Sequence, residues 1–360
     1  MQILALADDL TGALEIGAKF AARGIRSRVT LGRRLDFGRA LGLLVINTET
    51  RHVPPEQAYA RVRTLARAAR RRGIRRLYKK TDSTLRGHIG WELAALLAAH
   101  PRGHVIYAPA YPALGRAVRQ GRLYVNGVPV EETEFARDPL NPIHASDIPR
   151  VLAAQGAVPV FADSGELAER LAPGIYVCDG ESTADVDRVA ERLARQPSGW
   201  LAAGPAALAE AIAERLRPGA VARPAWPVVR TCLIVNGSLH PVSLAQVRYA
   251  AERGCAGGSG WDLLPLPEAA GLSGQAYAAR LGEAVRAAIQ ARLPDALVIF
   301  GGDTAAAILR ALGCTALRPV GELLPGVPLA RLERRALWLI SKAGGFGPPD
   351  VLCALRNLLS

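Results

Sequence analysis

A short apolar run, a turn of small or charged residues and then apolar residues at helical spacing recur along this chain of 360 residues. The first copy begins with a strand predicted at Ile3–Ala7 and continues through DDLTG into a helix. Leu43–Ile46 and His104–Ala108 are predicted to be further strands, and helical patterns lie between them. Strands that alternate with helices pair in parallel, so the pattern predicts an α/β fold with largely parallel sheets flanked by helices.

Two segments interrupt this rhythm. Gly115–Pro149 contains Asn126-Gly127 between two β-prone runs, so a β-hairpin insertion is expected in the N-terminal half. Arg217–Pro227 contains three prolines and no helical pattern, and the domain boundary is placed there. Because the chain is too long for one typical core, we expect two domains, residues 1–222 and residues 223–360, each with its own largely parallel sheet.

The formal net charge of +13 limits the kinds of partner. Many arginines lie on helical segments such as Tyr59–Arg76, where a solvated helix face is the ordinary interpretation. A basic field would also attract anionic substrates such as nucleotides or sugar acids. Aromatic residues make up only 5% of the chain, and neither a zinc-finger spacing nor an RNA-binding aromatic signature occurs. Nucleic acid is therefore not expected as a partner.

The cysteines and the N-terminus bear on the compartment. The chain has five widely spaced cysteines and no CxxC motif, which favours neither a zinc site nor a disulfide framework. They are Cys178, Cys232, Cys255, Cys314 and Cys353. Reduced thiols in a cytoplasmic protein are expected. The N-terminal MQILALADDL meets two aspartates too early for a signal peptide, and no run approaches the roughly 18 apolar residues of a membrane span.

Acidic residues follow the first predicted strand. Asp8 and Asp9 come directly after its last residue, and Thr11 opens the next helix. Two neighbouring carboxylates at the carboxyl edge of a sheet can bind a metal ion or accept a proton from a substrate hydroxyl. The alternative is that Asp9 or Thr11 only caps the helix.

Charged and hydroxyl-bearing residues also crowd the stretch YKKTDSTLRG, between an apolar run and a helix. Arginine offers a two-pronged donor to a carboxylate, and hydroxyls with the amides of a helix start can complete an anion site. A third basic strand end follows HVIYAPAYP. The candidate substrate-binding residues are Lys80, Asp82, Ser83, Arg86, Gly115 and Arg116. The alternatives are a surface ion pair between Asp82 and Arg86, and a structural turn at Gly115.

Glycine-rich turns follow three predicted strands of the C-terminal half. They are Gly237-Ser238, Gly301-Gly302 and Gly344-Gly345-Phe346-Gly347. A glycine turn before a helix lets the backbone approach an anion, and the helix start favours negative charge. Three such turns indicate a nucleotide-phosphate site, although glycine there can also serve tight packing. The Walker pattern GxxxxGK[ST] and the dinucleotide pattern GxGxxG are both absent from the sequence.

Taken together, these segments resemble the four-carbon acid sugar kinase family, in whose order they occur over nearly the whole chain. They are ADDLTGA at 7–13, KKTDSTLRG at 79–87, APAYPALGR at 108–116, VNGVPVEETEFARDP at 125–139, VNGS at 235–238, GGDT at 301–304, PGVP at 325–328 and KAGGFG at 342–347. The resemblance implies that residues 1–222 bind a sugar acid and residues 223–360 bind ATP. It implies ATP- and Mg²⁺-dependent phosphorylation of a hydroxyl of threonate, erythronate or 3-oxo-tetronate.

The resemblance also implies roles for single residues. Asp8 or Asp9 would accept the proton of the attacking hydroxyl. Arg86, helped by Lys80 and Ser83, would hold the substrate carboxylate. The implied nucleotide-binding residues are Ser238, Gly301, Gly302, Asp303, Thr304, Gly344, Gly345 and Gly347. No metal ligand is assigned. The chain departs from the family pattern at His240, Pro241 and Ala305.

Two other classes of protein remain open from the sequence. A catalytically silent sensor would bind a sugar acid or a nucleotide through the same motifs. A dehydrogenase would bind NAD(P) instead of ATP. In each case the expected partner is a small anionic molecule, neither nucleic acid nor a membrane is expected, and a homo-oligomer is left open.

Overall fold

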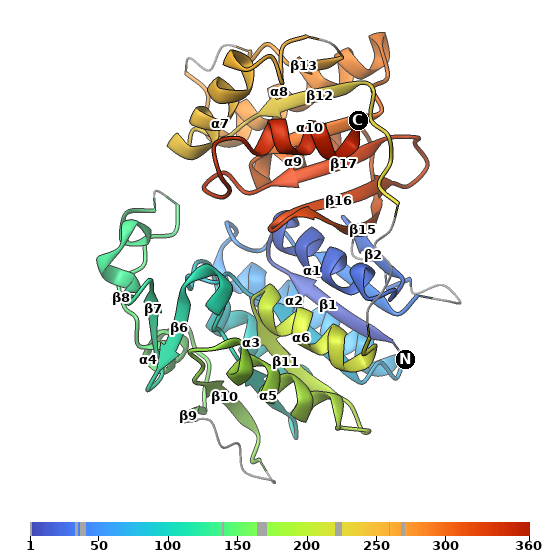
Figure 1. The fold of residues 1–360 in the computed structure, drawn as a ribbon. Helices are drawn as coiled ribbons and strands as arrows, with labels where there is room; N and C mark the ends of the chain where they lie inside the picture. Colours follow the sequence, from blue (N-terminus) through green and yellow to red (C-terminus); the bar gives the residue numbers. More distant parts are fainter. Residues whose placement is uncertain are drawn as a thin grey trace.

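Fourteen strands form one sheet that runs through both halves of the molecule (Figure 1). The computed structural model describes residues 2–32, 35–36, 41–138, 140–163, 171–219, 225–258, 260–267 and 271–360. The strand order is β13-β12-β14-β17-β16-β15-β2-β3-β1-β4-β11-β5-β10-β9. Most neighbouring strands are parallel and helices flank the sheet, so the predicted α/β class is confirmed.

The N-terminal part of the sheet consists of parallel strands, β2 to β9 in the order above. Its central strands, ILALA in β1 and LLVIN in β3, are buried along their whole length, which explains their continuous apolar sequences. The strands are β1 (Ile3–Ala7), β2 (Ser27–Thr30), β3 (Leu43–Asn47), β4 (Arg76–Lys80), β5 (His104–Tyr107), β9 (Val160–Asp163), β10 (Gly174–Cys178) and β11 (Trp200–Gly204).

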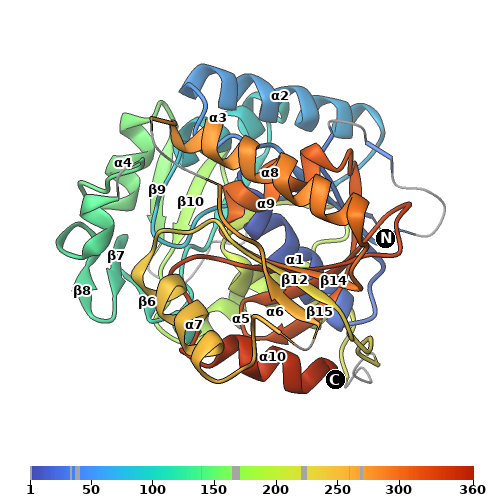
Figure 2. The same ribbon diagram turned by 90° about the horizontal axis from the view of Figure 1, so that it is seen from above.

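Helices cover both faces of this part. α2 packs against α3, while α1 and α5 both pack against α6 on the opposite face (Figures 1 and 2). The helices are α1 (Leu10–Ala22), α2 (Pro55–Arg71), α3 (Ile89–Ala99), α4 (Ile148–Ala154), α5 (Thr183–Ala194) and α6 (Ala206–Leu216). Arg67, Arg70 and Arg71 of α2 are exposed, so much of the positive charge there lies on a solvated face, as expected.

The predicted hairpin insertion forms a separate antiparallel sheet beside the main one (Figure 1). Asn126-Gly127 makes the turn between β7 and β8, with positive φ at both residues. A second turn, at Gln120-Gly121, joins β6 to β7 and was not predicted. The elements are β6 (Arg116–Arg119), β7 (Arg122–Val125), β8 (Val128–Pro129) and the 3₁₀ turns η1 (Pro112–Leu114), η2 (Val130–Glu132) and η3 (Glu134–Arg137).

The C-terminal half contains the three predicted strand–turn–helix units, β12–α7, β14–α9 and β17–α10. Its parallel strands follow the order β13-β12-β14-β17. The elements are β12 (Cys232–Asn236), α7 (Pro241–Glu252), β13 (Trp261–Leu263), α8 (Gly274–Ala291), β14 (Ala296–Phe300), α9 (Gly302–Ala311), β15 (Ala316–Leu324), β16 (Val327–Leu332), β17 (Trp338–Lys342) and α10 (Val351–Leu359).

The antiparallel strands β15 and β16 join the two expected sheets into one. β16 pairs with β17, and β15 pairs with β2 of the N-terminal half through Ala316 opposite Thr30 and Leu317 opposite Val29. Helix α1 packs on β15 as well, where Lys19 lies 2.9 Å from Oε2 of Glu322. The predicted boundary between residues 222 and 223 lies outside the described residues.

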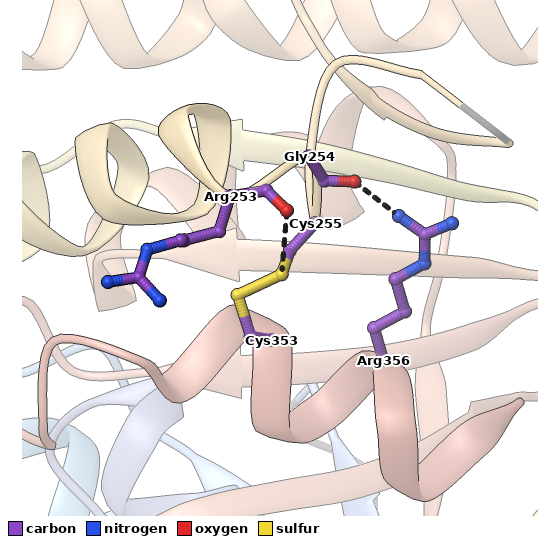
Figure 3. The surroundings of a disulfide bond; sticks show 5 residues. All are labelled: Arg253, Gly254, Cys255, Cys353 and Arg356. Carbon is purple, nitrogen blue, oxygen red and sulfur yellow. Dashed lines mark hydrogen bonds between the residues drawn. A yellow bond between two sulfur atoms is a disulfide. The ribbon is translucent and has the colours of Figure 1, made fainter.

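One expectation about the cysteines is wrong. Cys255, which follows α7, and Cys353 in α10 form a disulfide although 98 residues separate them (Figure 3). The guanidinium of Arg356 donates to the carbonyl oxygen of Gly254 beside the bridge, at 2.7 Å. The predicted absence of a disulfide failed because tertiary packing brings these distant cysteines together. In the described part of the chain, we find no helix both long and apolar enough to cross a membrane.

Candidate functional site

The strand order places the charged segments of the N-terminal half at one edge of the sheet. β1 lies between β3 and β4, and its last residue, Ala7, is opposite both Asn47 and Lys80. The segments that follow these three strands therefore begin side by side. The segment after β1 carries Asp8 and Asp9, and the segment after β4 carries Asp82. The segment after β3 contains no residue predicted to act at the site.

That segment supplies Arg51, which bridges the two neighbouring aspartates. Its Nε donates to Oδ2 of Asp8 at 2.7 Å, and its Nη1 donates to Oδ2 of Asp9 at 2.8 Å. Its Nη2 lies 3.8 Å from Oδ2 of Asp82. Burial disfavours the charge on Arg51, but the three carboxylates hold its pKa well above the usual value. The sequence signal that could have identified Arg51 is its place as a basic residue in the polar segment that follows β3.

The two aspartates differ in their surroundings. Asp8 is buried, and its Oδ1 has no hydrogen-bond partner among the described residues. Burial alone would raise the pKa of Asp8, but the charges of Arg51, Lys79 and Lys80 keep it below the usual value. Asp9 is half-buried and accepts a hydrogen bond from the amide of Gly12 at 2.9 Å. Asp9 therefore caps α1, as the alternative predicted, and also binds Arg51.

In the loop after β4, Arg86 is occupied by carboxylates. Its Nη2 donates to Oδ2 of Asp82 at 2.8 Å, its Nε to Oδ1 of Asp82 at 3.1 Å, and its Nη1 to Oδ2 of Asp138 at 3.2 Å. Burial would raise the pKa of Asp82, yet Arg86 and Arg51 lower it well below the usual value. The alternative of an Asp82–Arg86 ion pair is thus present, but it is largely buried.

The neighbouring residues of this loop take different parts. The Asp82 carboxylate is bound by Thr84 and not by Ser83. The amide and the hydroxyl of Thr84 donate to Oδ1 of Asp82 at 2.9 and 2.6 Å. Ser83 is half-buried. Lys80 is buried and donates to the carbonyl oxygen of Thr81 at 2.9 Å, with Oε2 of Glu15 3.8 Å away.

A buried ion pair that was not predicted lies beneath the aspartates. Nζ of Lys79 is 3.0 Å from Oε2 of Glu92 in α3, and the side chains of both residues are almost inaccessible to solvent. The hydroxyl of Thr50 donates to Oε1 of Glu92 at 2.6 Å. Burial raises the pKa of Glu92 despite the attraction of Lys79. The pair holds β4, α3 and the segment after β3 together under the site.

Gly115 and Arg116 differ in role. Gly115 shapes a turn, and Arg116 remains a candidate for substrate binding. Gly115 has a φ of 72°, and a Cβ placed on it would lie 1.9 Å from Oδ1 of Asn126, so the turn requires glycine. The guanidinium carbon of Arg116 lies 5.8 Å from the ring centres of Phe135 and Phe346. Phe346 belongs to the C-terminal half, so Arg116 lies where the two halves meet.

The three glycine turns of the C-terminal half also lie together. β12, β14 and β17 are neighbours in the sheet, so their carboxyl ends share one edge. A Cβ on Gly237 would be 2.0 Å from Oγ1 of Thr304, and a Cβ on Gly344 would be 2.3 Å from Oγ of Ser238. Gly301 has a φ of 104° at the start of α9. Gly237 and Gly344 are therefore required by close packing against Thr304 and Ser238, which is the alternative raised from the sequence. Gly301 stands directly before α9, where the amides of a helix start can bind an anion.

The loop after β17, which contains Gly344, Gly345 and Gly347, is held from inside by side-chain donors. Nζ of Lys342 donates to the carbonyl oxygens of Ala343 and Phe346 at 2.7 and 2.6 Å. Nε2 of Gln246 donates to the carbonyl oxygens of Phe346 and Gly347 at 3.0 and 2.9 Å. Carbonyl groups held in this way leave the amides of the glycines available to an anion. Burial lowers the pKa of Lys342 to about 8.

The start of α7 shows how the departures from the family pattern are accommodated. His240 caps this helix, because its Nδ1 accepts a hydrogen bond from the amide of Val242 at 3.2 Å. Pro241 occupies the first helical position, where no amide donor is needed. The His240 ring also lies against Gly345, where a Cβ would be 3.1 Å from its Nε2.

The predicted residues of the two halves come together at the start of α9. A Cβ on Gly302 would lie 2.6 Å from Oγ1 of Thr11 and 3.8 Å from Oδ2 of Asp9. Asp303 is exposed, and its Oδ2 is 3.7 Å from Nε2 of His52. The acidic pair and the glycine turn at the start of α9 therefore lie side by side. Among the described residues, no group of three His, Cys, Asp or Glu side chains could by itself hold a metal ion.

Family models cover most of the chain. Residues 3–212 match a sugar-binding N-terminal domain, and residues 262–352 match a nucleotide-binding C-terminal domain. A Haemophilus influenzae protein of solved structure has the same fold, with a TM-score of 0.75 and 19% identity over 99% of this chain and 100% of that chain. A Bordetella bronchiseptica structure, described as a domain-swapped dimer with bound citrate, has a TM-score of 0.54 and 30% identity over 100% and 98%.

Named relatives match almost from end to end. The chain is 32% identical to a D-threonate kinase of Salmonella typhimurium, over 98% of this chain and 97% of that protein. It is 34% identical to a D-threonate kinase of B. bronchiseptica, over 96% and 95%. It is 30% identical to a 3-oxo-tetronate kinase of Methylobacterium radiotolerans, over 96% of each protein. This chain belongs to the four-carbon acid sugar kinase family.

Proposed function

We propose that this protein transfers the terminal phosphoryl group of ATP to a hydroxyl of a four-carbon sugar acid. The observation that carries the proposal is the contact between the halves, where Gly302 of the nucleotide-binding part lies against Thr11 and Asp9 of the sugar-binding part. A phosphate bound at the start of α9 would therefore be next to a carboxylate. Phosphoryl transfer needs mainly this kind of positioning and charge stabilisation. The relatives named as threonate and 3-oxo-tetronate kinases support the substrate class.

Asp9 is the proton acceptor in this proposal. Its Oδ2 points to the start of α9, and its side chain is more exposed than that of Asp8, at 19% against 4%. Asp8 and Arg51 would act as supports, because Arg51 binds both carboxylates and fixes the direction of Asp9. A carboxylate within reach of the attacking hydroxyl can accept its proton as the new bond to phosphorus forms.

The sugar acid would bind beside Asp9, along the segment after β4 and the start of β6. Lys80, Asp82, Ser83, Arg86 and Arg116 are the candidate contacts, and Gly115 would shape the turn. Lys80, Arg86 and Arg116 are the cationic groups there that would contact a short anion. The citrate in the B. bronchiseptica relative, a small polycarboxylate, is consistent with such a substrate.

ATP would bind through the glycine turns and the helix starts of the C-terminal half. The proposed contacts are Ser238, Gly301, Gly302, Asp303, Thr304, Gly344, Gly345 and Gly347. These residues fit a phosphate chain because the backbone at Gly301, Gly302 and Gly344 has no side chain in the way. Mg²⁺ would accompany the phosphates and neutralise part of their charge.

The arrangement of parts belongs to the same proposal. Residues 1–222 would form the sugar-acid domain and residues 223–360 the nucleotide domain, and a change in their separation would admit the substrates and then exclude water. A cytoplasmic location follows from the use of ATP. A homo-oligomer is proposed by analogy with the dimeric B. bronchiseptica relative.

The test is ADP release by the purified chain with Mg²⁺-ATP and a panel of D- and L-threonate, D- and L-erythronate and 3-oxo-tetronate. We expect turnover with at least one acid and a loss of about 1,000-fold in kcat for Asp9→Ala. Glu283→Gln, at an exposed ion pair of α8, is the control and should leave kcat unchanged. Thermal stabilisation by an acid without any ADP release would indicate a sensor and contradict the proposal.

A further inference from the structure

Arg51, Arg86 and Arg116 all lie near the proposed sugar-acid site. They differ in how their charge is neutralised. Arg51 and Arg86 each contact two or more carboxylates. Arg116 has no carboxylate within ion-pair distance among the described residues, although only 8% of it is exposed. Burial lowers the pKa of Arg116, because a buried charge with no partner is costly.

The donors of Arg116 are partly unused. Its Nη1 donates to the carbonyl oxygen of Leu114. Its Nε is buried with no hydrogen-bond acceptor among the described residues. Nε and Nη2 form the side of a guanidinium that binds both oxygens of a carboxylate. This side of Arg116 therefore lacks the acceptor that its chemistry calls for.

The position of Arg116 links three parts of the site. It begins β6 of the hairpin insertion, and its guanidinium carbon lies 5.8 Å from the ring centres of both Phe135 and Phe346. Phe135 is also 5.7 Å from the guanidinium carbon of Arg86, which belongs to the proposed substrate loop. Phe346 belongs to the glycine loop after β17. The two rings hold the Arg116 guanidinium at the junction of the sugar-binding and nucleotide-binding parts.

We propose that Arg116, and not Arg86, binds the carboxylate of the sugar acid and sets the preference for acids over neutral sugars. The inference rests on the proposed function and changes the residue that the sequence favoured for this role. The carboxylate would accept hydrogen bonds from Nε and Nη2 and neutralise the unpaired charge. Arg86 keeps Asp82 and the loop after β4 in place, and its three engaged nitrogens leave no such vacant side.

The test compares Arg116→Gln with Arg119→Gln, a matched change on the same strand at an exposed ion pair with Glu181. KM for the acid, KM for ATP and kcat are measured, together with turnover of threitol or erythritol, which lack the carboxylate. We expect Arg116→Gln to raise KM for the acid about 100-fold, as the loss of charge-assisted hydrogen bonds predicts. KM for ATP should stay within about threefold, and the preference for acid over alditol should fall by about the same 100-fold.

Two further measurements separate this role from a structural one. Arg116→Gln should melt no lower than the wild type, because it removes an unpaired buried charge. Arg116→Lys, which keeps the charge but lacks the paired donors, should fall between the wild type and Arg116→Gln in KM for the acid.

Three results would overturn the inference. If Arg116→Gln raised KM for ATP and not for the acid, the anion at Arg116 would be a nucleotide phosphate. If it behaved like Arg119→Gln, Arg116 would have no role in binding. If Arg86→Gln, and not Arg116→Gln, removed the preference for acids, the original assignment would stand. A wild-type protein that releases no ADP with any acid would instead refute the proposed function.

Discussion

Gly302 and Thr11 come from the two halves of the chain, yet a methyl group on Gly302 would lie 2.6 Å from the hydroxyl oxygen of Thr11. Gly302 starts α9 and Thr11 lies in the first turn of α1. The start of α9 therefore meets the start of α1 at the side chains of Thr11 and Asp9. Under the proposed function, a phosphate bound at the start of α9 would lie next to the start of α1, as transfer between two bound molecules needs.

Gly302→Ala should therefore damage transfer more than stability. The added methyl group must displace the Thr11 hydroxyl or the start of α9, and a misplacement of about 1 Å can cost about 100-fold in rate. We expect kcat/KM for the acid to fall by about that factor while the melting temperature changes by only a few degrees. Gly313→Ala is not a suitable control because its φ is positive. Gly274→Ala, at an open position in α8, is suitable and should have no effect. Equal activities of the two variants would show that the contact between the helix starts is not needed.

Arg51→Met should destabilise the folded protein by about 3–5 kcal/mol near pH 7, because it leaves buried carboxylates without their counter-charge. The free energy of unfolding should depend on pH with opposite signs in the wild type and in Arg51→Met. In the wild type the pKa values of Asp8 and Asp82 are lowered, so their stabilising effect is full above about pH 4 and is lost as the pH falls further. Without Arg51, burial dominates at Asp8 and should raise its pKa.

The variant should accordingly become less unstable as the pH falls from 7 to 5, because protonation removes the uncompensated charge. Urea unfolding at pH 5, 6 and 7 measures the difference between the two proteins. Arg67→Met, an exposed change on α2, is the control and should track the wild type at each pH. A difference in unfolding free energy that stayed constant over this range would show that Asp8 does not depend on Arg51.

Lys342 should make ATP binding depend on pH. Its ammonium group holds the carbonyl oxygens of the glycine loop, and burial lowers its pKa to about 8. As the pH rises through that value the group loses a proton and a donor, so KM for ATP should rise. KM for the acid should not follow the same curve. Lys342→Met should have a high KM for ATP that no longer changes between pH 7 and pH 9.

His240 lies against the same loop, so a change at this residue is the matched control. His240→Gln should keep the wild-type rise in KM for ATP near pH 8. Loss of the rise in this variant, with retention in Lys342→Met, would assign the effect to the histidine.

Reduction of the disulfide should weaken the C-terminal half without abolishing turnover. A disulfide typically contributes about 2–4 kcal/mol, and the Cys255–Cys353 bridge spans 98 residues. Cys255 follows the far end of α7, whose start is at the glycine turns, so the site should remain formed at 25 °C. Dithiothreitol should lower the urea midpoint of the wild type and leave that of Cys255→Ser unchanged. A wild-type midpoint that dithiothreitol does not alter would contradict the prediction.

The disulfide between Cys255 and Cys353 also provides a test of the proposed cytoplasmic location. Disulfides persist mainly outside the cytoplasm, so the proposed cytoplasmic location predicts that Cys255 and Cys353 react with an alkylating reagent when cells are lysed into it. Protection of both cysteines from the reagent would argue against that location.

The sequence alone determined the local elements and the residues that follow each strand. Ile3–Ala7 was predicted with its observed bounds, and the hairpin turn at Asn126-Gly127 was also predicted correctly. These features depend on contacts between near neighbours and on burial on both sides of a parallel strand, so a short window of sequence contains them. The grouping of Asp8, Asp9 and Asp82 could also be anticipated, because parallel strands end at one edge of a sheet.

Tertiary structure decided which partner each charged group takes. The sequence singles out Arg86 and Arg116 as candidates and gives no reason to choose Arg51. The order β3-β1-β4 brings Arg51 to the two neighbouring aspartates, and the loop after β4 folds Arg86 back onto Asp82. Arg116 is buried, and in the described part of the chain no carboxylate lies within ion-pair distance of it. Ion pairs form between groups brought close by chain segments far apart in the sequence, and their strength depends on burial, so neither can be known before the strands are ordered.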